Sequence, residues 1–310
     1  MKNVLLMFLL CLTLPFQSTF ASTSHSIGPA ERPATIKLPK NYSEKKSYPL
    51  ILMLHGYSNT VELTDFYLGT SRSQDGLGYL LLLPSGLKSK TDGKSFWNAI
   101  PACCDFANSG VDDSAYLTDL VKRAQAEYKV DANRIYIFGH SNGGFMAHRL
   151  ACDNDGLFKG IVSVAGSVYP DPADCKTETP INVLQVHGTE DPTVPFDTEG
   201  TDKAYPGAFG TVEFWAERNQ CKNYSVKLAA ENLVLIKWEI GVDKAFKPVL
   251  KGDVKDFLTL GLDSETDTFT YDQCAGNVRT ALWRVNGGGH APIFTGREFV
   301  KKALNFLDKK

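Results

Sequence analysis

The chain has 310 residues and a formal net charge of −2 at pH 7, from 33 basic and 35 acidic side chains. Scattered Lys and Arg at this balance do not form a nucleic-acid surface, so we expect no nucleic-acid partner. Hydrophobic residues make up 43% and aromatic residues 11%, which is ordinary for a globular core. The length suits one large α/β domain after a short leader.

The first 21 residues have the pattern of a secretory signal peptide. Lys2 supplies a positive start, Val4 to Leu14 form an apolar run, and Thr19-Phe20-Ala21 is a small-residue cleavage site. The apolar run is shorter than the roughly 20 residues that a membrane span needs. We therefore predict a mature protein, 22–310, that is secreted to the periplasm or the extracellular space and has no membrane span.

Cysteine usage agrees with export. Six cysteines follow the predicted signal, and an even number in an exported chain favours disulfides over zinc, because no C-x-x-C pair with matching partners occurs. Six cysteines allow 15 pairings, which the sequence alone leaves open. The six are Cys103, Cys104, Cys152, Cys175, Cys221 and Cys274.

In chain order, polar and apparently loose residues 22–33 precede a candidate early strand, Ala34 to Leu38. Short apolar runs then recur, as expected for strands buried on both faces of a parallel sheet. These runs are Pro49–Leu54, Leu80–Leu83, Ile135–Phe138, Gly160–Ala165, Ile181–Val186 and Ala281–Val285. Amphipathic helices are predicted from Asp112 or Asp113 to Ala124, and over Gly143–Ala151, Phe209–Arg218 and Arg297–Leu307. This alternation predicts an α/β fold with a mostly parallel central sheet and helices on both faces.

One region breaks the alternation. Residues 221–274 contain alternating stretches such as Asn232 to Ile240 and resemble a β-rich insertion before the last strand. Such a segment either covers a site at the carboxyl ends of the strands, as a lid, or decorates the surface. The sequence leaves both interpretations open.

The most informative motif is Gly139-His140-Ser141-Asn142-Gly143, a G-x-S-x-G pattern between a strand-like run and a helix-like run. A serine hydroxyl is a weak nucleophile that needs exposure, a base and oxyanion donors. A sharp strand-to-helix turn provides the exposure, and the glycines permit its strained, close-packed backbone. Ser141 is therefore the predicted nucleophile.

The acid and the base are expected later, in the chain order serine, acid, histidine. Asp191 lies in the loop just after the run Ile181–Val186, and Glu190 and Asp197 are its alternatives. His290 follows Asn286-Gly287-Gly288-Gly289 after the last strand, where the glycines let the imidazole reach back over the sheet edge. Asp191 would hold one nitrogen of this ring while the other accepts the serine proton.

The oxyanion hole requires two backbone N–H groups aimed at the developing charge. One should come from Asn142, the residue after the nucleophile, and the other from the loop His55-Gly56-Tyr57, where we assign it to the Tyr57 amide. No metal or organic cofactor is required by this chemistry.

Taken together, these motifs resemble the α/β-hydrolase esterase family of polyhydroxybutyrate depolymerases, feruloyl esterases and acetylxylan esterases. The resemblance rests on stretches that span residues 36–307. They are Leu54-His55-Gly56-Tyr57, Phe96-Trp97-Asn98 with Cys103-Cys104, Val111-Asp112-Asp113, Asp131 to Tyr136, Gly139 to Gly144, Arg149 to Cys152, His187 to Pro195 and Gly287 to His290.

The resemblance implies an α/β-hydrolase fold and a serine carboxylic ester hydrolase with the triad Ser141, Asp191 and His290. It also implies that Cys221 pairs with Cys274, so that the other four cysteines pair among themselves, with one disulfide anchoring the helix at Cys152. The chain departs from the family at the long 221–274 segment and after His290, where Ala291-Pro292 replaces an aromatic-proline pair.

The implied substrate is a small or oligomeric ester, from a hydroxyalkanoate or from a polysaccharide-linked acid. Four aromatic residues either line its pocket or belong to the core: Phe96, Trp97, Trp215 and Phe294. The rival interpretations are a serine peptidase of the same fold, which usually carries a propeller or helical cap, and a non-catalytic binding protein on a hydrolase scaffold, which usually lacks a triad member.

Overall fold

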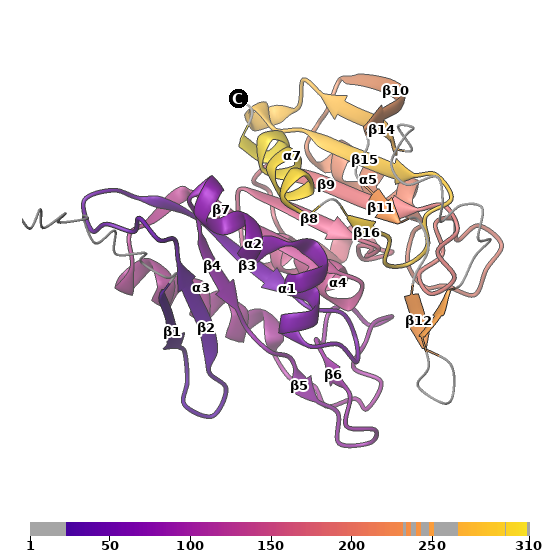
Figure 1. Cartoon of the computed structure of the whole chain (residues 1–310). Coiled ribbons are helices and arrows are strands. Elements are labelled where there is room, and N and C mark those ends of the chain that lie inside the picture. Colours follow the sequence, from indigo (N-terminus) through magenta and orange to yellow (C-terminus); the bar gives the residue numbers. More distant parts are fainter. Residues whose placement is uncertain are drawn as a thin grey trace, which may run out of the picture.

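A computed structural model of the chain describes residues 23–231, 234–236, 240–242, 248–250, 266–294 and 296–308. Its centre is a twisted ten-stranded sheet (Figure 1). The order across the sheet is β1 (Thr23–Ile27), β2 (Ala34–Leu38), β4 (Leu80–Leu83), β3 (Tyr48–Leu54), β7 (Val130–His140), β8 (Gly160–Val164), β9 (Asn182–Gly188), β15 (Thr280–Val285), β14 (Thr266–Asp272) and β10 (Asn223–Glu231).

The strands from β4 to β15 in this order are parallel to their neighbours, and antiparallel strands extend the sheet at both ends. All the predicted apolar runs lie in the parallel part. Because parallel strands point the same way, the loops after β3, β7, β9 and β15 meet at one edge of the sheet.

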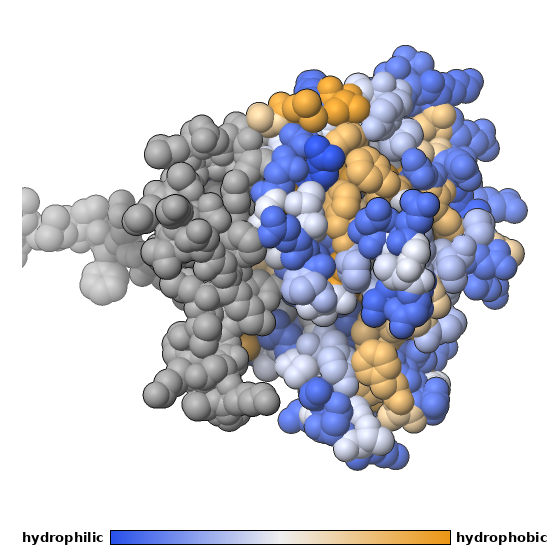
Figure 2. Space-filling view, turned by 90° about the vertical axis from the view of Figure 1, so that its right-hand side faces the viewer, coloured by the Kyte–Doolittle hydropathy of each residue, from blue (hydrophilic) through white to orange (hydrophobic). Residues whose placement is uncertain are grey.

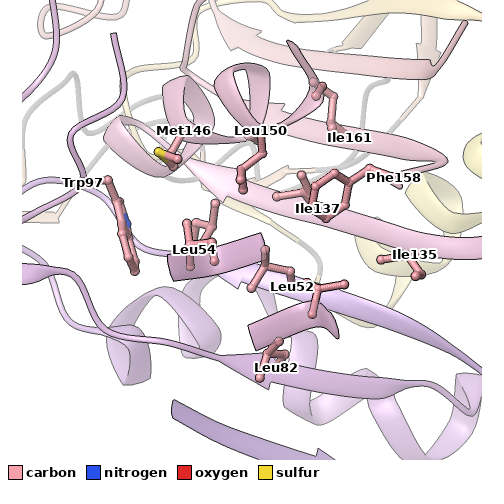
Figure 3. Close-up of a cluster of buried hydrophobic side chains, with 14 of the residues drawn as sticks. Leu52, Leu54, Leu82, Trp97, Ile135, Ile137, Met146, Leu150, Phe158 and Ile161 are labelled. Atoms are coloured by element: carbon pink, nitrogen blue, oxygen red, sulfur yellow. The ribbon is translucent and has the colours of Figure 1, made fainter. Parts of the chain in front are cut away.

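Helices cover both faces of the sheet (Figure 1). One face carries α1 (Val61–Leu68), α2 (Thr70–Leu77) and α7 (Arg297–Asp308), and the other carries α3 (Asp113–Glu127), α4 (Asn142–Asp153) and α5 (Ala208–Arg218). A hydrophobic core lies on each face of the sheet, and alternate residues of β3 contribute to the two cores. Leu52 and Leu54 pack toward α4, while Met53 packs on the opposite face. Figure 3 shows Leu52 and Leu54 beside Met146 and Leu150 of α4.

The predicted α/β-hydrolase fold class is confirmed, and two local expectations need correction. Residues 22–33 are not uniformly loose, because Thr23–Ile27 forms β1 and pairs antiparallel with β2. The helices α1 and α2 have no counterpart among the elements predicted from the sequence. Gly69, in the left-handed conformation at φ 75°, ends α1 and begins α2, and each helix has only eight residues, so neither shows a long amphipathic repeat.

The described part of the 221–274 segment is β-rich, as predicted. β10 and β14 pair antiparallel and extend the main sheet beyond β15. Farther along, β11 (Val234–Ile236) pairs with β16 (Ile293–Phe294), and β12 (Ile240–Val242) pairs with β13 (Pro248–Leu250). The stretch Asn232 to Ile240 lies partly outside the described residues. Smaller elements are β5 (Leu87–Lys88), β6 (Ser95–Phe96) and the 3₁₀ turns Pro172–Asp174 and Ala275–Asn277.

Candidate active site

Ser141 lies in the sharp turn between β7 and α4. Its backbone has φ 54° and ψ −122°, a conformation that residues with a side chain rarely adopt. The Ser141 amide donates to the Val164 carbonyl at 2.8 Å, which holds the turn against the end of β8. The side chain is partly exposed at the carboxyl edge of the sheet.

Glycines allow this turn because no side chain would fit beside it. A Cβ on Gly139 would overlap the Gly143 carbonyl oxygen, and a Cβ on Gly143 would overlap the Leu54 carbonyl oxygen. A Cβ on Gly56 would lie 3.2 Å from the Ser141 Cβ, so the loop after β3 passes directly beside the serine. Strand, turn and loop therefore meet at backbone contact distance.

Asp191 is buried near the start of the loop after β9. Its Oδ1 accepts hydrogen bonds from the Thr193 and Val194 amides at 2.8 and 2.9 Å, and its Oδ2 accepts one from His290 Nδ1 at 2.8 Å. Burial raises the pKa of this carboxyl, but hydrogen bonds from His187 and His290 outweigh burial and hold the pKa below its usual range. Asp191 is thus an anion that contacts the His290 ring.

The two alternative acids lie elsewhere. Glu190 and Asp197 are both exposed on the same loop, and the Oδ1 atom of Asp197 accepts the Glu199 amide at 3.0 Å. Among the described residues, Asp191 alone has a carboxylate hydrogen-bonded to His290.

The acid and base loops are joined to each other. The Glu190 amide donates to the Gly288 carbonyl at 2.9 Å, and the Gly287 amide donates to the Thr189 hydroxyl at 2.8 Å. His140, next to the serine, donates from Nε2 to the His290 carbonyl at 3.0 Å. These bonds tie the serine turn and the two loops together.

Within the described residues, the Ser141 hydroxyl makes no hydrogen bond, to His290 or to any other group. The rings of His140 and His290 are 5.0 Å apart, which places His290 next to the serine turn. In unliganded hydrolases this contact often tightens only when substrate is bound.

The predicted oxyanion donors belong to the two backbone segments that meet at the serine. Asn142 is the first residue of α4, and Tyr57 follows Gly56. Neither amide donates a hydrogen bond to another described residue, so both are available to a ligand. The Asn142 side chain has a separate role that the sequence did not indicate, because it exchanges hydrogen bonds of 2.7 and 2.9 Å with the Trp97 backbone.

A pocket of about 460 Å³ opens beside Ser141. Figure 2, which views the right-hand side of Figure 1, shows hydrophobic surface in a band between hydrophilic residues. The pocket is lined by aromatic and small apolar side chains, with Asp202 and Lys203 also in its wall. Its aromatic residues are Tyr57, Phe106, Phe145 and Tyr205.

The four aromatic residues considered from sequence belong to the core instead. Phe96, Trp97, Trp215 and Phe294 are at most 2% exposed, and none of them lines this pocket. The sequence alternative of plain core packing is therefore correct for all four. Phe106 and Tyr205 were missed because they lie in irregular loops, where no periodic pattern marks a residue as facing a site.

All six cysteines after residue 21 are joined in disulfides. Cys221 pairs with Cys274, as the resemblance implies, and Cys152 at the end of α4 pairs with Cys175. Cys103 pairs with its neighbour Cys104, and both line the pocket beside Ser141.

No group of three or more potential metal ligands occurs among the residues that the structure describes. Over the same residues, no helix has the length and apolar character of a membrane span.

Comparison with known proteins identifies the family of this chain. The profile of the phospholipase/carboxylesterase family matches residues 41–216, more than half of the chain, and the chain belongs to this family. The predicted membership of an α/β-hydrolase esterase family is thereby confirmed.

Two curated relatives have more specific names. Feruloyl esterase B of Piromyces equi is 25% identical over 285 residues, which are 87% of this chain and 45% of that protein. The bifunctional acetylxylan esterase/xylanase XynS20E of Neocallimastix patriciarum is 23% identical over 58% of this chain and 24% of that protein. The chain thus spans less than half the length of these relatives.

Among solved structures, the acetyl xylan esterase from Aspergillus awamori superposes with a TM-score of 0.60 and 13% identity, covering 92% of this chain and 98% of that one. The superposition supports the fold. The resemblance to feruloyl and acetylxylan esterases that the motifs predict is confirmed by these relatives.

Proposed function

We propose that this protein is a secreted serine esterase in which Ser141, His290 and Asp191 form a catalytic triad. The observation that carries the proposal is the buried Asp191 carboxylate, hydrogen-bonded to His290 Nδ1 at 2.8 Å, on the same sheet edge as the strained Ser141 turn. An Asp–His pair beside an exposed, strained serine is the arrangement that acyl transfer requires.

In the proposed reaction, His290 Nε2 accepts the Ser141 proton as the serine oxygen attacks the ester carbonyl. Asp191 keeps the proton on Nδ1 and stabilises the imidazolium that forms. The Asn142 and Tyr57 amides donate hydrogen bonds to the negatively charged oxygen of the tetrahedral intermediate, and each contributes about 3 kcal/mol of transition-state stabilisation. His290 then protonates the leaving alcohol, and a water molecule activated by the same ring releases the acid from Ser141.

The test is Ser141→Ala, assayed with p-nitrophenyl acetate. Loss of the nucleophile should lower kcat by about 10⁶-fold, leaving only the contribution of binding and of the oxyanion donors. Ser225→Ala, at an exposed position on β10, is the control and should retain wild-type activity. Wild-type rates in Ser141→Ala would refute the triad.

Fluorophosphonate labelling addresses the non-catalytic alternative. The reagent should modify wild-type protein at Ser141 and leave Ser141→Ala unlabelled. An unlabelled wild-type protein would favour a binding protein on a hydrolase scaffold. Hydrolysis of peptide substrates in preference to esters would favour the serine peptidase alternative.

For the substrate, we propose an ester of a small aromatic acid linked to a plant polysaccharide. The supporting observations are the four aromatic side chains around the 460 Å³ pocket and the names of the relatives. A flat aromatic acid buries more surface against such walls than a short aliphatic acid does. Methyl ferulate should therefore be hydrolysed with a higher kcat/KM than hydroxybutyrate oligomers, and the reverse order would favour a hydroxyalkanoate substrate.

We further propose that residues 1–21 are a cleaved signal and that 22–310 form one exported α/β-hydrolase domain. Three disulfides support export, since such bonds persist in oxidising compartments. Within this domain, β11 would border the active site, because it pairs with β16, and β16 follows His290 closely in the chain. Mass spectrometry of the protein from culture medium or periplasm tests the cleavage after Ala21.

A further inference from the structure

Four buried side chains lead from α5 to the proposed catalytic acid. They are Trp215, His148, Gln185 and His187, each at most 2% exposed. Trp215 Nε1 lies 2.9 Å from His148 Nδ1, and His148 Nε2 lies 3.2 Å from Gln185 Oε1. Gln185 Nε2 lies 3.0 Å from His187 Nδ1, and His187 Nε2 lies 3.4 Å from Asp191 Oδ2.

The direction of every hydrogen bond in this series follows from its ends. An indole N–H can only donate, so His148 accepts at Nδ1 and carries its proton on Nε2. That proton goes to Gln185 Oε1, which leaves the Gln185 amide nitrogen facing His187. The Gly166 carbonyl accepts from the same amide nitrogen at 2.8 Å and fixes the amide orientation independently.

His187 is consequently held in one neutral form. Its Nδ1 accepts from Gln185, so its proton is on Nε2, where the Val194 carbonyl accepts it at 2.9 Å and Asp191 Oδ2 lies 3.4 Å away. Asp191 Oδ2 thereby faces two ring N–H groups, from His187 and from His290. The single Nε2–H of His187 is thus shared between the Val194 carbonyl, which is nearer, and Asp191 Oδ2.

From this geometry we propose that His187 is a positioning residue for the esterase reaction, a further inference that rests on the proposed triad. His187 supplies a second ring N–H near Asp191 Oδ2, in addition to that of His290, and shares the carboxylate charge. Gln185, whose amide is fixed by the Gly166 carbonyl, keeps His187 in the form that donates. Without this bond, a lone pair on His187 Nε2 could face the Asp191 anion and repel it.

The other titratable side chains near the pair are few. His140 from β7 and Tyr205 from the loop before α5 interact electrostatically with the Asp191–His290 pair, in addition to His187 from β9. Burial, and then the neighbouring His290, lower the pKa of His140 to about 3, so His140 stays neutral in the working range. His187 is the only one of these three within 3.5 Å of the Asp191 carboxylate among the described residues.

The experiment compares His187→Leu with His187→Gln in the full-length mature protein. A hydrogen bond to a charged group is worth about ten- to a hundredfold in an equilibrium, so His187→Leu should lower kcat by about tenfold with KM nearly unchanged. In His187→Leu, Asp191 has one hydrogen-bond donor fewer, so its negative charge stabilises the protonated His290 ring more strongly. The acid limb of the kcat/KM profile, where activity is lost as the pH falls, should therefore move to higher pH. His187→Gln returns an N–H to the Nε2 position and should restore most of kcat and the limb.

The matched control is His148→Leu, which deletes an equally buried histidine that does not touch Asp191. In His148→Leu the Gly166 carbonyl still accepts a hydrogen bond from the Gln185 amide and fixes its orientation. The acid limb should therefore keep its wild-type position even if Tm falls. An unshifted limb in folded His187→Leu, or an equal shift in both variants, would overturn the proposal. An active Ser141→Ala would instead refute the triad, so the two failures are distinguishable.

If His187→Leu does not fold, ¹⁵N-histidine NMR of the wild-type protein decides the question. At neutral pH both His148 and His187 should give the chemical shifts of neutral rings protonated at Nε2. A charged ring or an Nδ1–H form of His187 would contradict the proposed direction of the hydrogen bonds.

Discussion

The serine turn and the loop that carries the acid are held in place by different means. Ser141 is positioned by backbone packing, with Gly139 and Gly143 in contact with carbonyl oxygens that no side chain could approach. Asp191 is positioned by hydrogen bonds to both of its oxygens, from two backbone amides and from imidazole groups. The serine turn should be disrupted by an added side-chain atom, whereas the position of Asp191 should be disrupted by loss of a hydrogen-bond donor or acceptor. Different substitutions should therefore affect the two regions separately.

Of the substitutions that distinguish the two regions, the largest effect is expected where the hydrogen bonds to Asp191 are disturbed and its shape is retained. Asp191→Asn keeps the volume but can present an N–H to His290, which favours the wrong tautomer of the base and should lower kcat by about 10⁴-fold. The amides of Thr193 and Val194 still have an oxygen to bind, so Tm should change little. Steady-state kinetics with p-nitrophenyl acetate measure kcat, and a thermal melt measures Tm.

Asp197→Asn is the control for this change, because Asp197 is exposed on the same loop and has no contact with His290 among the described residues. It should leave kcat at the wild-type value. A large loss in Asp197→Asn with a small one in Asp191→Asn would reassign the acid.

The same contrast explains what the sequence could predict. The G-x-S-x-G turn, the glycines before His290 and the apolar strands are local patterns, and each lies where the sequence placed it. The contacts of His187 with Asp191 and of Asn142 with the Trp97 backbone join residues from separate elements. Such contacts depend on the tertiary arrangement of side chains with no periodicity, so a single sequence does not indicate them.

Steric overlap at the serine turn gives the second prediction. In Gly143→Ala the new methyl group would meet the carbonyl groups of Leu54 and His55, which are backbone atoms at the end of β3 and cannot move aside cheaply. Overpacking of this kind should lower the free energy of unfolding by about 3 kcal/mol and displace Ser141, so activity should fall as well. Urea unfolding and ester hydrolysis measure both effects.

Gly210→Ala provides a matched helical glycine. A Cβ at this position in α5 would meet the Pro206 Cβ at 2.9 Å, so Pro206 has to shift, but no backbone atom lies as close and alanine favours a helix over glycine by up to about 1 kcal/mol. The loss of stability should therefore be much smaller than in Gly143→Ala, with activity retained. Equal losses at both glycines would indicate that helix flexibility, and not the contact with β3, accounts for the effect.

The smallest expected effect concerns pH and the buried histidines that support the acid loop. Burial lowers the pKa of His148 from 6.5 to about 4, so between these values the folded protein keeps this ring neutral while the unfolded chain protonates it. The unfolded state then binds more protons, and the free energy of unfolding should fall by about 1.4 kcal/mol per pH unit for this group as the pH decreases. His148→Gln should reduce the slope of stability against pH by that amount, whereas His25→Gln, at an exposed site on β1, should not. Urea unfolding from pH 6.5 to 4.5 measures the slope, and a slope unchanged in His148→Gln would mean that His148 takes up a proton in the folded protein.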